Sequence, residues 1–189
     1  MALRTFIGIG MNEEVKQMLF DVQQQCRQRC RKGNFTERDN FHMTLHFLGE
    51  TEQEEIEDLK QAIYETAIKT KQFVMVIKQL GVFQRGERGI LWVGVEHNKS
   101  LLYLFEGLQR SLARQGFARE KKKLSPHITL ARQVEPYGNF VQMQKAVTVE
   151  PKEMHVDSMT LFESVRIGGK LIYRPLFTQQ LKQIKYNRY

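Results

Sequence analysis

The sequence predicts a mixed fold of helices and strands in which one structural unit is used about twice. Two observations carry this prediction. Segments with the apolar spacing of helices and of strands alternate along the chain. A pattern of histidine, apolar residue, threonine and leucine also occurs twice, at residues 42–45 and 127–130, on two segments that resemble strands. Each predicted unit therefore contains one copy of the pattern.

The first half of the chain is predicted to alternate strand and helix. Residues 3–10 form a strand, and Asn12 is placed to cap a helix. The helix has its apolar residues on one side, namely Val15, Met18, Leu19, Val22 and Cys26. Residues 41–48 form the strand with the first motif. Thr51 followed by Glu54 has the pattern of a capping box, which opens a second helix.

The second half repeats this order, with two strands in place of the first strand and two further strands at its end. The predicted elements are strands at 73–82 and 90–95, a helix starting at Asn98, the second motif strand at 127–132, a short helix near 136–145, and strands at 155–167 and 170–177. Gly168 and Gly169 separate the last two strands. Paired glycines suit a two-residue hairpin turn because both of its positions need positive φ.

Length and composition indicate an ordinary globular protein. The chain has 189 residues, of which 41% are hydrophobic and 26% charged. This length fits one domain or two small lobes that share a core. Residues 1–10 contain too short an apolar run for a signal peptide, and no segment is long enough to span a membrane. We therefore expect a cytoplasmic protein.

The formal net charge of +8 favours polyanionic partners, nucleic acid first. Basic residues form three clusters: Arg27, Arg29, Arg31 and Lys32; Arg119, Lys121, Lys122 and Lys123; and Lys182, Lys185 and Arg188. Most of these charges are expected to be solvated. The cluster just before the second motif is the best candidate for contacting phosphates, because of its position.

Cys26 and Cys30 are the only two cysteines. On a helix they would share a face, but a tetrahedral metal would need two further ligands, and none occurs at a recognisable spacing. We interpret both as buried small apolar residues in a reducing compartment.

Strand alternation gives the two motifs a chemical meaning. Residues i and i+2 of a strand point to the same side, so His42 and Thr44 project from one face and His127 and Thr129 from another. The opposite face of the first strand would hold Phe41, Met43, Leu45 and Phe47. The same counting places His46 beside His42, as a wall residue of the cleft.

Two imidazoles and two hydroxyls around one anion suit the cleavage of a phosphodiester. One histidine takes a proton from water, the other protonates the leaving oxygen, and the hydroxyls hold the phosphate oxygens. No metal is required. A structural role in the core and metal binding are the alternatives, but no aspartate, glutamate or cysteine joins either strand. His97 and His155 lack the pattern, and we assign them no role.

The chain resembles the two-histidine phosphoesterase superfamily, and within it the RNA 2′,3′-cyclic phosphodiesterases, also described as 2′-5′ RNA ligases. The resemblance rests on residues 41–50 (FHMTLHFLGE) and 125–132 (SPHITLAR), and on the intervening residues 91–94 (LWVG). Length and element order agree over essentially the whole chain.

The resemblance implies an α+β fold with two pseudo-symmetric lobes, each with an antiparallel sheet, and a cleft between them, so that residues 1–189 form a single bilobal domain. It implies hydrolysis of a 2′,3′-cyclic phosphate to a 2′-phosphomonoester, without metal or cofactor. His42 would be the proton donor to the leaving oxygen and His127 the proton acceptor from water. Thr44 and Thr129 would bind the phosphate, assisted by Arg132.

Strict alternation places Arg132 on the apolar face with Ile128 and Leu130. Arg132 therefore reaches the phosphate only if its strand ends or bulges first. Its alternative role is that of a solvated arginine at a strand end.

Several questions stay open at the level of sequence. The expected partners are RNA ends or nucleotides that bear a cyclic phosphate, and the expected oligomeric state is a monomer. The same site could instead join RNA ends through a 2′-5′ bond, or only bind nucleotides. A base is expected to stack on an aromatic side chain, for which Phe47, Phe83, Trp92 and Tyr173 are candidates.

Overall fold

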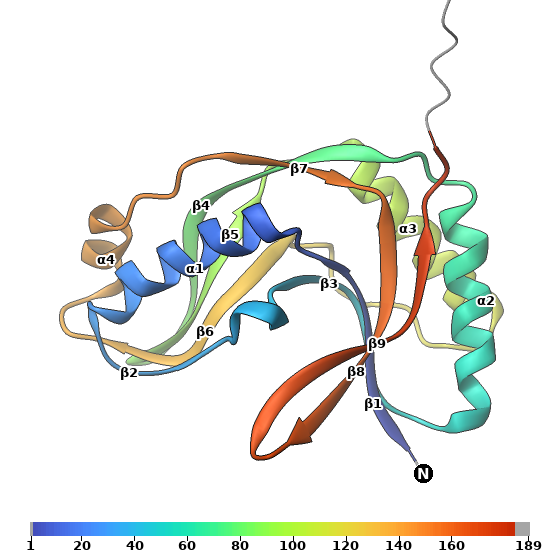
Figure 1. The fold of residues 1–189 in the computed structure, drawn as a ribbon, viewed down its shortest axis with the longest axis horizontal. Coiled ribbons are helices and arrows are strands. Elements are labelled where there is room, and N and C mark those ends of the chain that lie inside the picture. Colours follow the sequence, from blue (N-terminus) through green and yellow to red (C-terminus); the bar gives the residue numbers. More distant parts are fainter. Residues whose placement is uncertain (1, 184–189) are drawn as a thin grey trace, which may run out of the picture.

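The computed structural model describes residues 2–183 and shows a strongly curved antiparallel sheet with helices packed against it (Figure 1). The strands are β1 (Leu3–Gly10), β2 (Cys30–Phe35), β3 (His42–Thr51), β4 (Phe73–Arg85), β5 (Arg88–Val95), β6 (His127–Pro136), β7 (Lys152–Val156), β8 (Ser158–Ile167) and β9 (Lys170–Gln180). The helices are α1 (Glu13–Arg27), α2 (Ile56–Ala67), α3 (Lys99–Arg114) and α4 (Phe140–Ala146). The combination of helices with an antiparallel sheet confirms the predicted α+β class.

The sheet consists of two halves that meet between the motif strands. Its order is β7-β4-β5-β6-β3-β1-β8-β9, with β2 added to β6. Within each half the strands pair over many residues, whereas β3 and β6 pair only where Met43 lies opposite Ile128. Because each half contains one motif strand, the bilobal arrangement that the sequence predicted is confirmed.

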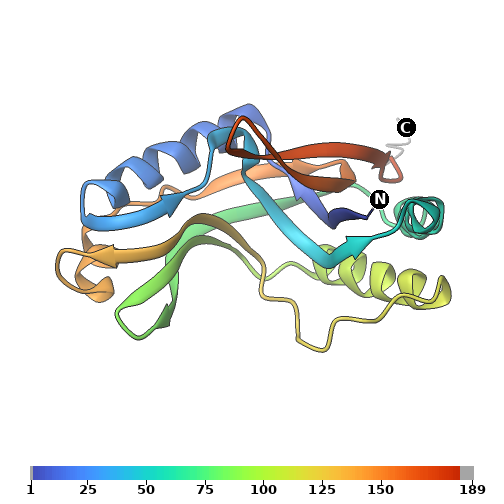
Figure 2. The ribbon, with the colours of Figure 1, turned by 90° about the horizontal axis from the view of Figure 1, so that it is seen from below.

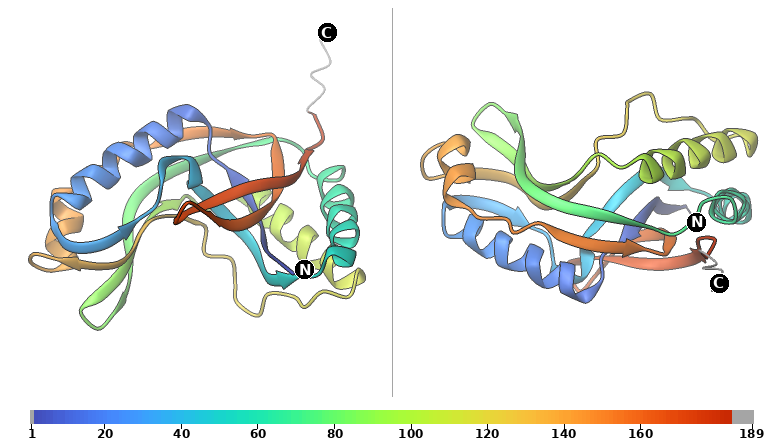
Figure 3. Two further views of the ribbon diagram at one scale, coloured as in Figure 1. Left: turned by 60° about the horizontal axis from the view of Figure 1, so that its bottom comes forward. Right: turned by 90° about the horizontal axis from the view of Figure 1, so that it is seen from above.

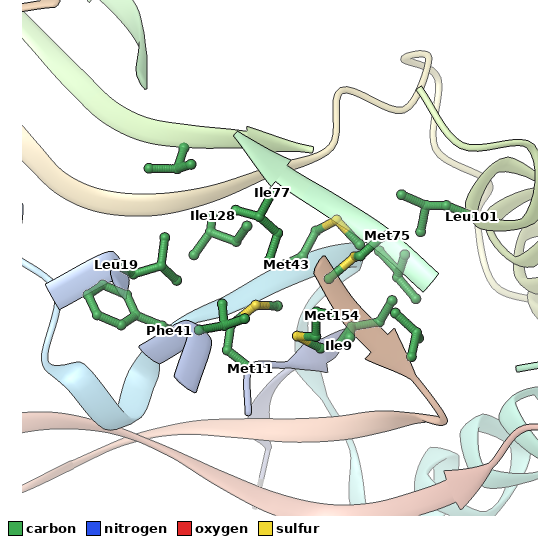
Figure 4. Close-up of a cluster of buried hydrophobic side chains, with 14 of the residues drawn as sticks. Ile9, Met11, Leu19, Phe41, Met43, Met75, Ile77, Leu101, Ile128 and Met154 are labelled. Atoms are coloured by element: carbon green, nitrogen blue, oxygen red, sulfur yellow. The ribbon is translucent and has the colours of Figure 1, made fainter. Parts of the chain in front are cut away.

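The helices divide between the two halves. α1 and α4 lie along the β2–β6 end of the molecule, and α2 and α3 pack on each other at the opposite end (Figures 2 and 3). Between them lies a core that includes Leu19, Ile77, Met43 and Ile128 (Figure 4). Met43 and Ile128 are fully buried, which fixes the orientation of both motif strands.

The predicted helix starts at Asn12 and Asn98 and the last hairpin are confirmed. Asn12 accepts a hydrogen bond from the backbone N–H of Val15, and Asn98 accepts one from Leu101, so both asparagines cap their helices. Gly168 and Gly169 have φ values of +57° and +80° and form the turn between β8 and β9. The short helix α4 begins slightly later than predicted.

The predicted capping box at Thr51 is wrong by one residue. Thr51 ends β3, and its hydroxyl lies 2.6 Å from that of Thr5. The box is made by Glu52 and Glu55, around a single 3-10 turn that precedes α2. Thr51 stays in the strand because this buried hydroxyl pair satisfies its side chain.

The single strand predicted at residues 155–167 is two strands. β7 ends at Val156 and β8 begins at Ser158, and the two pair with different halves of the sheet, β7 with β4 and β8 with β1. The chain crosses between the halves at Asp157. The sequence also gave no sign of β2, whose residues CRKGNF are mostly polar because it is an exposed edge strand.

Cys26 and Cys30 are buried, as predicted, and both are free thiols. Cys26 is in α1, whereas Cys30 begins β2, so the two do not share a helix face. The Cys30 thiol donates to the carbonyl oxygen of Cys26 at 3.0 Å. Burial raises the pKa of Cys26 to about 12 and that of Cys30 to about 11, so both stay protonated.

Two predictions concern the outer parts of the molecule. No helix within residues 2–183 is long and apolar enough to cross a membrane. Of the predicted C-terminal basic cluster, Lys182 is seen, whereas Lys185 and Arg188 lie outside the described residues.

Candidate active site

The strand register brings the two motifs together. Met43 lies opposite Ile128, and the strands are antiparallel. One residue to either side, His42 therefore faces Thr129, and Thr44 faces His127. The four side chains stand on the face opposite the buried Met43 and Ile128. The register has two-fold pseudo-symmetry, in which each histidine is the cross-strand counterpart of the threonine of the other motif.

Both histidines are held by the same backbone contact. The Nδ1 atom of His42 lies 2.7 Å from the carbonyl oxygen of Asn40, and that of His127 lies 2.6 Å from the carbonyl oxygen of Ser125. A carbonyl oxygen only accepts, so Nδ1 carries the proton in both neutral rings. This leaves Nε2 as the atom that can exchange a proton with a substrate. In His42 it accepts from the Thr44 hydroxyl at 3.1 Å.

The environment favours the neutral form of both imidazoles. The pKa of His42 is lowered to about 4, mainly by burial and also by the positive charge of Arg132, against the opposing effect of the Asn40 hydrogen bond. Burial also lowers the pKa of His127, again with a contribution from Arg132. A bound anion would counter both effects, because it stabilises a neighbouring imidazolium.

Each motif strand contains a bulge at the motif leucine. Along β3, Thr44 pairs with Gly8 and His46 with Ile7, so Leu45 is the extra residue. Along β6, Thr129 pairs with Trp92 and Ala131 with Leu91, so Leu130 is the extra residue. Each bulge reverses the alternation for the residues that follow it.

The reversal corrects two predictions in the first motif. His46 does not line the cleft: it is buried, and its Nδ1 lies 3.1 Å from Nε2 of Gln109 on α3. Phe47 is not in the core, because it is half exposed and lies on the same side as His42. Counting residues beyond Thr44 therefore gave the wrong face for both.

The same reversal places Arg132 at the site. Ala131 is buried in place of Arg132, which is exposed and lines a pocket with His42 and Thr44. The bulge that the sequence required for this placement is present at Leu130. By motif position Phe47 and Arg132 are equivalent, so the two lobes contribute an aromatic ring and a cation.

The pocket has a volume of about 690 Å³ and is built mainly from the lobe of the first motif. Its lining residues are Arg4, Phe6, His42, Thr44, Phe47, Arg132, Ser164, Arg166, Leu171 and Tyr173. His127 and Thr129 do not line it but stand across the β3–β6 junction. The site thus consists of a pocket on one side of His42 and the second motif on the other.

Aromatic rings flank both histidines. The ring of Phe6 lies 4.6 Å and that of Tyr173 4.9 Å from the ring of His42, while Phe83 lies 5.1 Å from His127. Trp92 lies 6.0 Å from His127. All four stacking candidates from the sequence, Phe47, Phe83, Trp92 and Tyr173, therefore border the site.

Gly81 explains how Trp92 fits beside His127. The two residues are cross-strand partners, and a Cβ atom on Gly81 would lie 2.1 Å from the indole ring. The absence of a side chain at this position lets the indole lie across the β4 backbone. The rigid ring in turn limits the positions that His127 can take.

The basic cluster before the second motif is not in this pocket. Arg119 and Lys123 line a separate pocket against α3, together with Leu101 and Phe105. The cluster therefore does not line the pocket beside His42, and its contact with phosphates stays a prediction. Besides Arg132, the pocket is lined by Arg4 and Arg166, which are isolated in the sequence and gave no local signal.

Asn40 fixes the wall of the site beside His42. Its backbone carbonyl orients His42, and its buried side chain reaches β9. There Nδ2 donates to the carbonyl of Leu171 at 2.7 Å, and Oδ1 accepts from the N–H of Tyr173 at 3.1 Å. One residue therefore positions both the imidazole and the aromatic ring that faces it.

Replacing Asn40 with leucine should lower the free energy of unfolding by about 1–3 kcal/mol, because two backbone groups of β9 lose their partners. Urea denaturation of the variant and the unmodified protein would measure this change in the free energy of unfolding. Asn34→Leu is the matched control, because Asn34 is exposed on β2, and its effect should stay within about 0.5 kcal/mol. Equal losses in the two variants would contradict the assigned role of the Asn40 side chain.

Comparison with known proteins places this site in context. The family model for LigT-like phosphoesterases matches residues 9–92 and 93–173, one match for each motif. The chain is 29% identical to the RNA 2′,3′-cyclic phosphodiesterase of Thermotoga maritima, over 95% of this chain and 96% of the relative. It is 30% identical to the protein of that name from Aquifex aeolicus, over 90% and 93%.

Solved structures agree with these sequence matches. Escherichia coli LigT complexed with 3′-AMP superposes with a TM-score of 0.78 at 25% identity, covering 97% of this chain and all of that one. Protein TT0787 of Thermus thermophilus superposes with a TM-score of 0.79 at 24% identity, over 95% of this chain and 98% of that one, and shows a shared fold.

Proposed function

This chain belongs to the family of LigT-like phosphoesterases, and we propose that it hydrolyses RNA or nucleoside 2′,3′-cyclic phosphates to 2′-phosphomonoesters by metal-independent acid/base catalysis. The observation that carries the proposal is the matched geometry of His42 and His127. Each donates Nδ1–H to the carbonyl two residues earlier, which leaves Nε2 as the atom that can exchange a proton, and the two motif strands pair at Met43 and Ile128. Relatives named RNA 2′,3′-cyclic phosphodiesterase support the substrate class.

The proposed reaction is a single in-line displacement at phosphorus. Nε2 of His127 takes a proton from a water molecule whose oxygen forms the new bond to phosphorus. The bond from phosphorus to the ribose 3′ oxygen breaks, and Nε2–H of His42 gives that oxygen its proton. The product keeps its phosphate on the 2′ oxygen. Proton exchange with solvent then returns His127 to its neutral form and His42 to its protonated form.

His42 must be protonated before it can act, although its pKa is lowered to about 4, mainly by burial. The phosphodiester is an anion, and its binding beside His42 raises the pKa of the imidazole. Proton uptake is therefore coupled to substrate binding. His127 acts as the base and is already neutral near pH 7, since its pKa is lowered from the ordinary value.

The remaining motif residues are proposed to hold the phosphate. Thr44 and Thr129 each donate a hydroxyl hydrogen bond to a non-bridging oxygen, and the guanidinium of Arg132 neutralises the charge that develops there. Their positions support these roles, because Thr44 and Arg132 line one pocket with His42, and Thr129 faces His42.

The test is hydrolysis of adenosine 2′,3′-cyclic phosphate in the presence of EDTA. We expect full activity with EDTA, and no gain when Mg²⁺ or Mn²⁺ is added. Within residues 2–183, no cluster of three or more metal-ligating side chains is arranged to hold a metal. Loss of activity in EDTA that returns with a metal would contradict the proposal. A parallel assay with RNA ends tests for 2′-5′ ligation at the same site, and nucleotide binding without product would favour a binding module.

Replacing Arg132 with glutamine should move the pH profile of kcat/KM to higher pH. The charge of Arg132 lowers the pKa of both histidines, so its removal raises both. Each histidine then stays protonated up to a higher pH, and both limbs of the bell-shaped curve shift in the alkaline direction. Arg132→Lys, which keeps the charge, should leave the limbs in place. An acid shift in the glutamine variant would contradict this account.

The cytoplasmic location and the monomeric state stay predictions. Size-exclusion chromatography with light scattering would measure the oligomeric state directly. RNA ends and nucleotides with a cyclic phosphate remain the proposed partners, consistent with the 3′-AMP that Escherichia coli LigT binds.

A further inference from the structure

The pocket beside His42 extends well past the motif residues, along β1 and β8. Arg4 and Phe6 stand on one face of β1, and Phe6 touches the ring of His42. Ser164 and Arg166 stand on the same face of the neighbouring strand β8 and line the same pocket. Two strand residues cover about 7 Å, so Arg4 lies roughly one nucleotide unit beyond the ring that contacts His42.

In the part of the chain that the structure describes, the arginines of this extension make no close ion pair. Among residues 2–183, no carboxylate oxygen lies within 4.0 Å of the Arg4, Arg132 or Arg166 guanidinium. The neighbouring Arg174 behaves differently, because it donates from both Nε and Nη2 to the buried Glu163. In this half of the sheet, Arg174 is therefore in an ion pair, whereas the arginines that line the pocket make none with any described residue.

The contacts that Arg4 and Arg166 do make leave most of their donors available. The Arg4 guanidinium lies 5.5 Å from the centre of the Phe47 ring, and Arg166 donates from Nη1 to the carbonyl of Gly169 at 3.3 Å. Each guanidinium has five N–H donors in a fork that suits phosphate oxygens. The charges of Arg4 and Arg132 both lower the pKa of Tyr173, against the larger raising effect of burial, so the two cations act on one region of the pocket.

The β8–β9 hairpin forms the outer wall of this extension. It projects from the body of the molecule on the concave side of the sheet (Figure 1). Asn40 ties β9 to the start of β3, which fixes the hairpin relative to His42. The extension is therefore a built surface attached to the candidate site.

We propose that Arg4 and Arg166 form a second phosphate site, which binds the phosphodiester on the 5′ side of the terminal nucleotide. The inference rests on the proposed function, since it needs the cyclic phosphate to lie between His42 and His127. A nucleoside 2′,3′-cyclic phosphate has no such second phosphate. The enzyme therefore prefers RNA ends to mononucleotides, and these two arginines supply the preference.

The test compares a dinucleotide that ends in a 2′,3′-cyclic phosphate, ApA>p, with the mononucleoside A>p. We expect the ratio of their kcat/KM values to favour ApA>p in the unmodified protein. Arg4→Gln and Arg166→Gln should each lower this ratio about tenfold, the size of one charge-assisted hydrogen bond to phosphate. Arg110→Gln is the control, since it removes the same charge from the exposed surface of α3 and should leave the ratio unchanged.

A binding measurement separates failure of this site from failure of the proposed function. In a His42→Gln background, calorimetric titration with ApA>p should give weaker binding after Arg4→Gln or Arg166→Gln. The slope of log K against log salt concentration should also fall by about 0.7 for each lost contact. An unchanged ratio and unchanged binding overturn the second phosphate site. Equal losses for ApA>p and A>p also overturn it, because the arginines would then serve the cyclic phosphate itself.

Discussion

Replacing His42 or His127 with glutamine should lower kcat for A>p by about 10²–10⁴-fold, the contribution of a positioned general acid or base. Glutamine has nearly the same reach but cannot exchange a proton near neutral pH. Each histidine has a distinct role in one displacement, so the double variant should lose little more than the stronger single variant. Steady-state kinetics at fixed pH measures all three.

The matched control for these variants is His155→Gln. His155 is exposed on β7, lacks the motif and should keep full activity. Circular dichroism and thermal unfolding would show that the variants remain folded. Activity within a few-fold of the unmodified protein in either motif variant would contradict the assignment of both histidines to proton transfer.

Replacing Thr44 or Thr129 with valine should lower kcat/KM by about 10- to 100-fold. Valine keeps the β-branched shape that suits the strand but removes the hydroxyl, so one hydrogen bond to an anionic oxygen is lost, worth about 1.5–3 kcal/mol. The loss should appear in both variants, because the pseudo-symmetry of the site lets each threonine hydroxyl donate a hydrogen bond to the phosphate. Thr44→Val also removes the hydrogen bond to Nε2 of His42.

Thr148→Val is the control for the threonine variants, since Thr148 is exposed in the segment after α4 and away from the pocket. A full loss in one motif threonine and none in the other would show that the phosphate contacts only one lobe. The symmetric arrangement of hydroxyls would then be wrong.

Repetition made the centre of the site predictable from sequence. The two motifs showed which residues share a strand face, and the buried Met43 and Ile128 show that the alternation was assigned correctly up to each threonine. Cap residues were equally visible, because Asn12 and Asn98 satisfy local backbone donors and act within four residues.

Alternation failed where an extra residue entered a strand. Nothing in the side chains of Leu45 and Leu130 signals a bulge, because both leucines remain buried. The bulges depend on how the neighbouring strands pair with β3 and β6, and this pairing cannot be read from the local sequence. His46 and Phe47 were therefore assigned to the wrong faces, while for Arg132 the sequence could state only the condition that the structure meets.

Long-range pairing accounts for the other failures. β7 and β8 read as one strand because a single residue, Asp157, separates them, and only their different partners reveal the break. Arg4 and Arg166 line one pocket and Asn40 bonds to β9 beside it, but the three come from segments far apart in the chain, so the sequence could not bring them together.

The central claim is that His42 and His127 hydrolyse a 2′,3′-cyclic phosphate by breaking the bond between phosphorus and the ribose 3′ oxygen. The most direct measurement is the identity of the product formed from A>p in EDTA, resolved by chromatography against 2′-AMP and 3′-AMP. We expect 2′-AMP alone, formed at least about 10²-fold more slowly by the His42→Gln or His127→Gln variant. Formation of 3′-AMP, or of 2′-AMP at an undiminished rate in these variants, would contradict the claim.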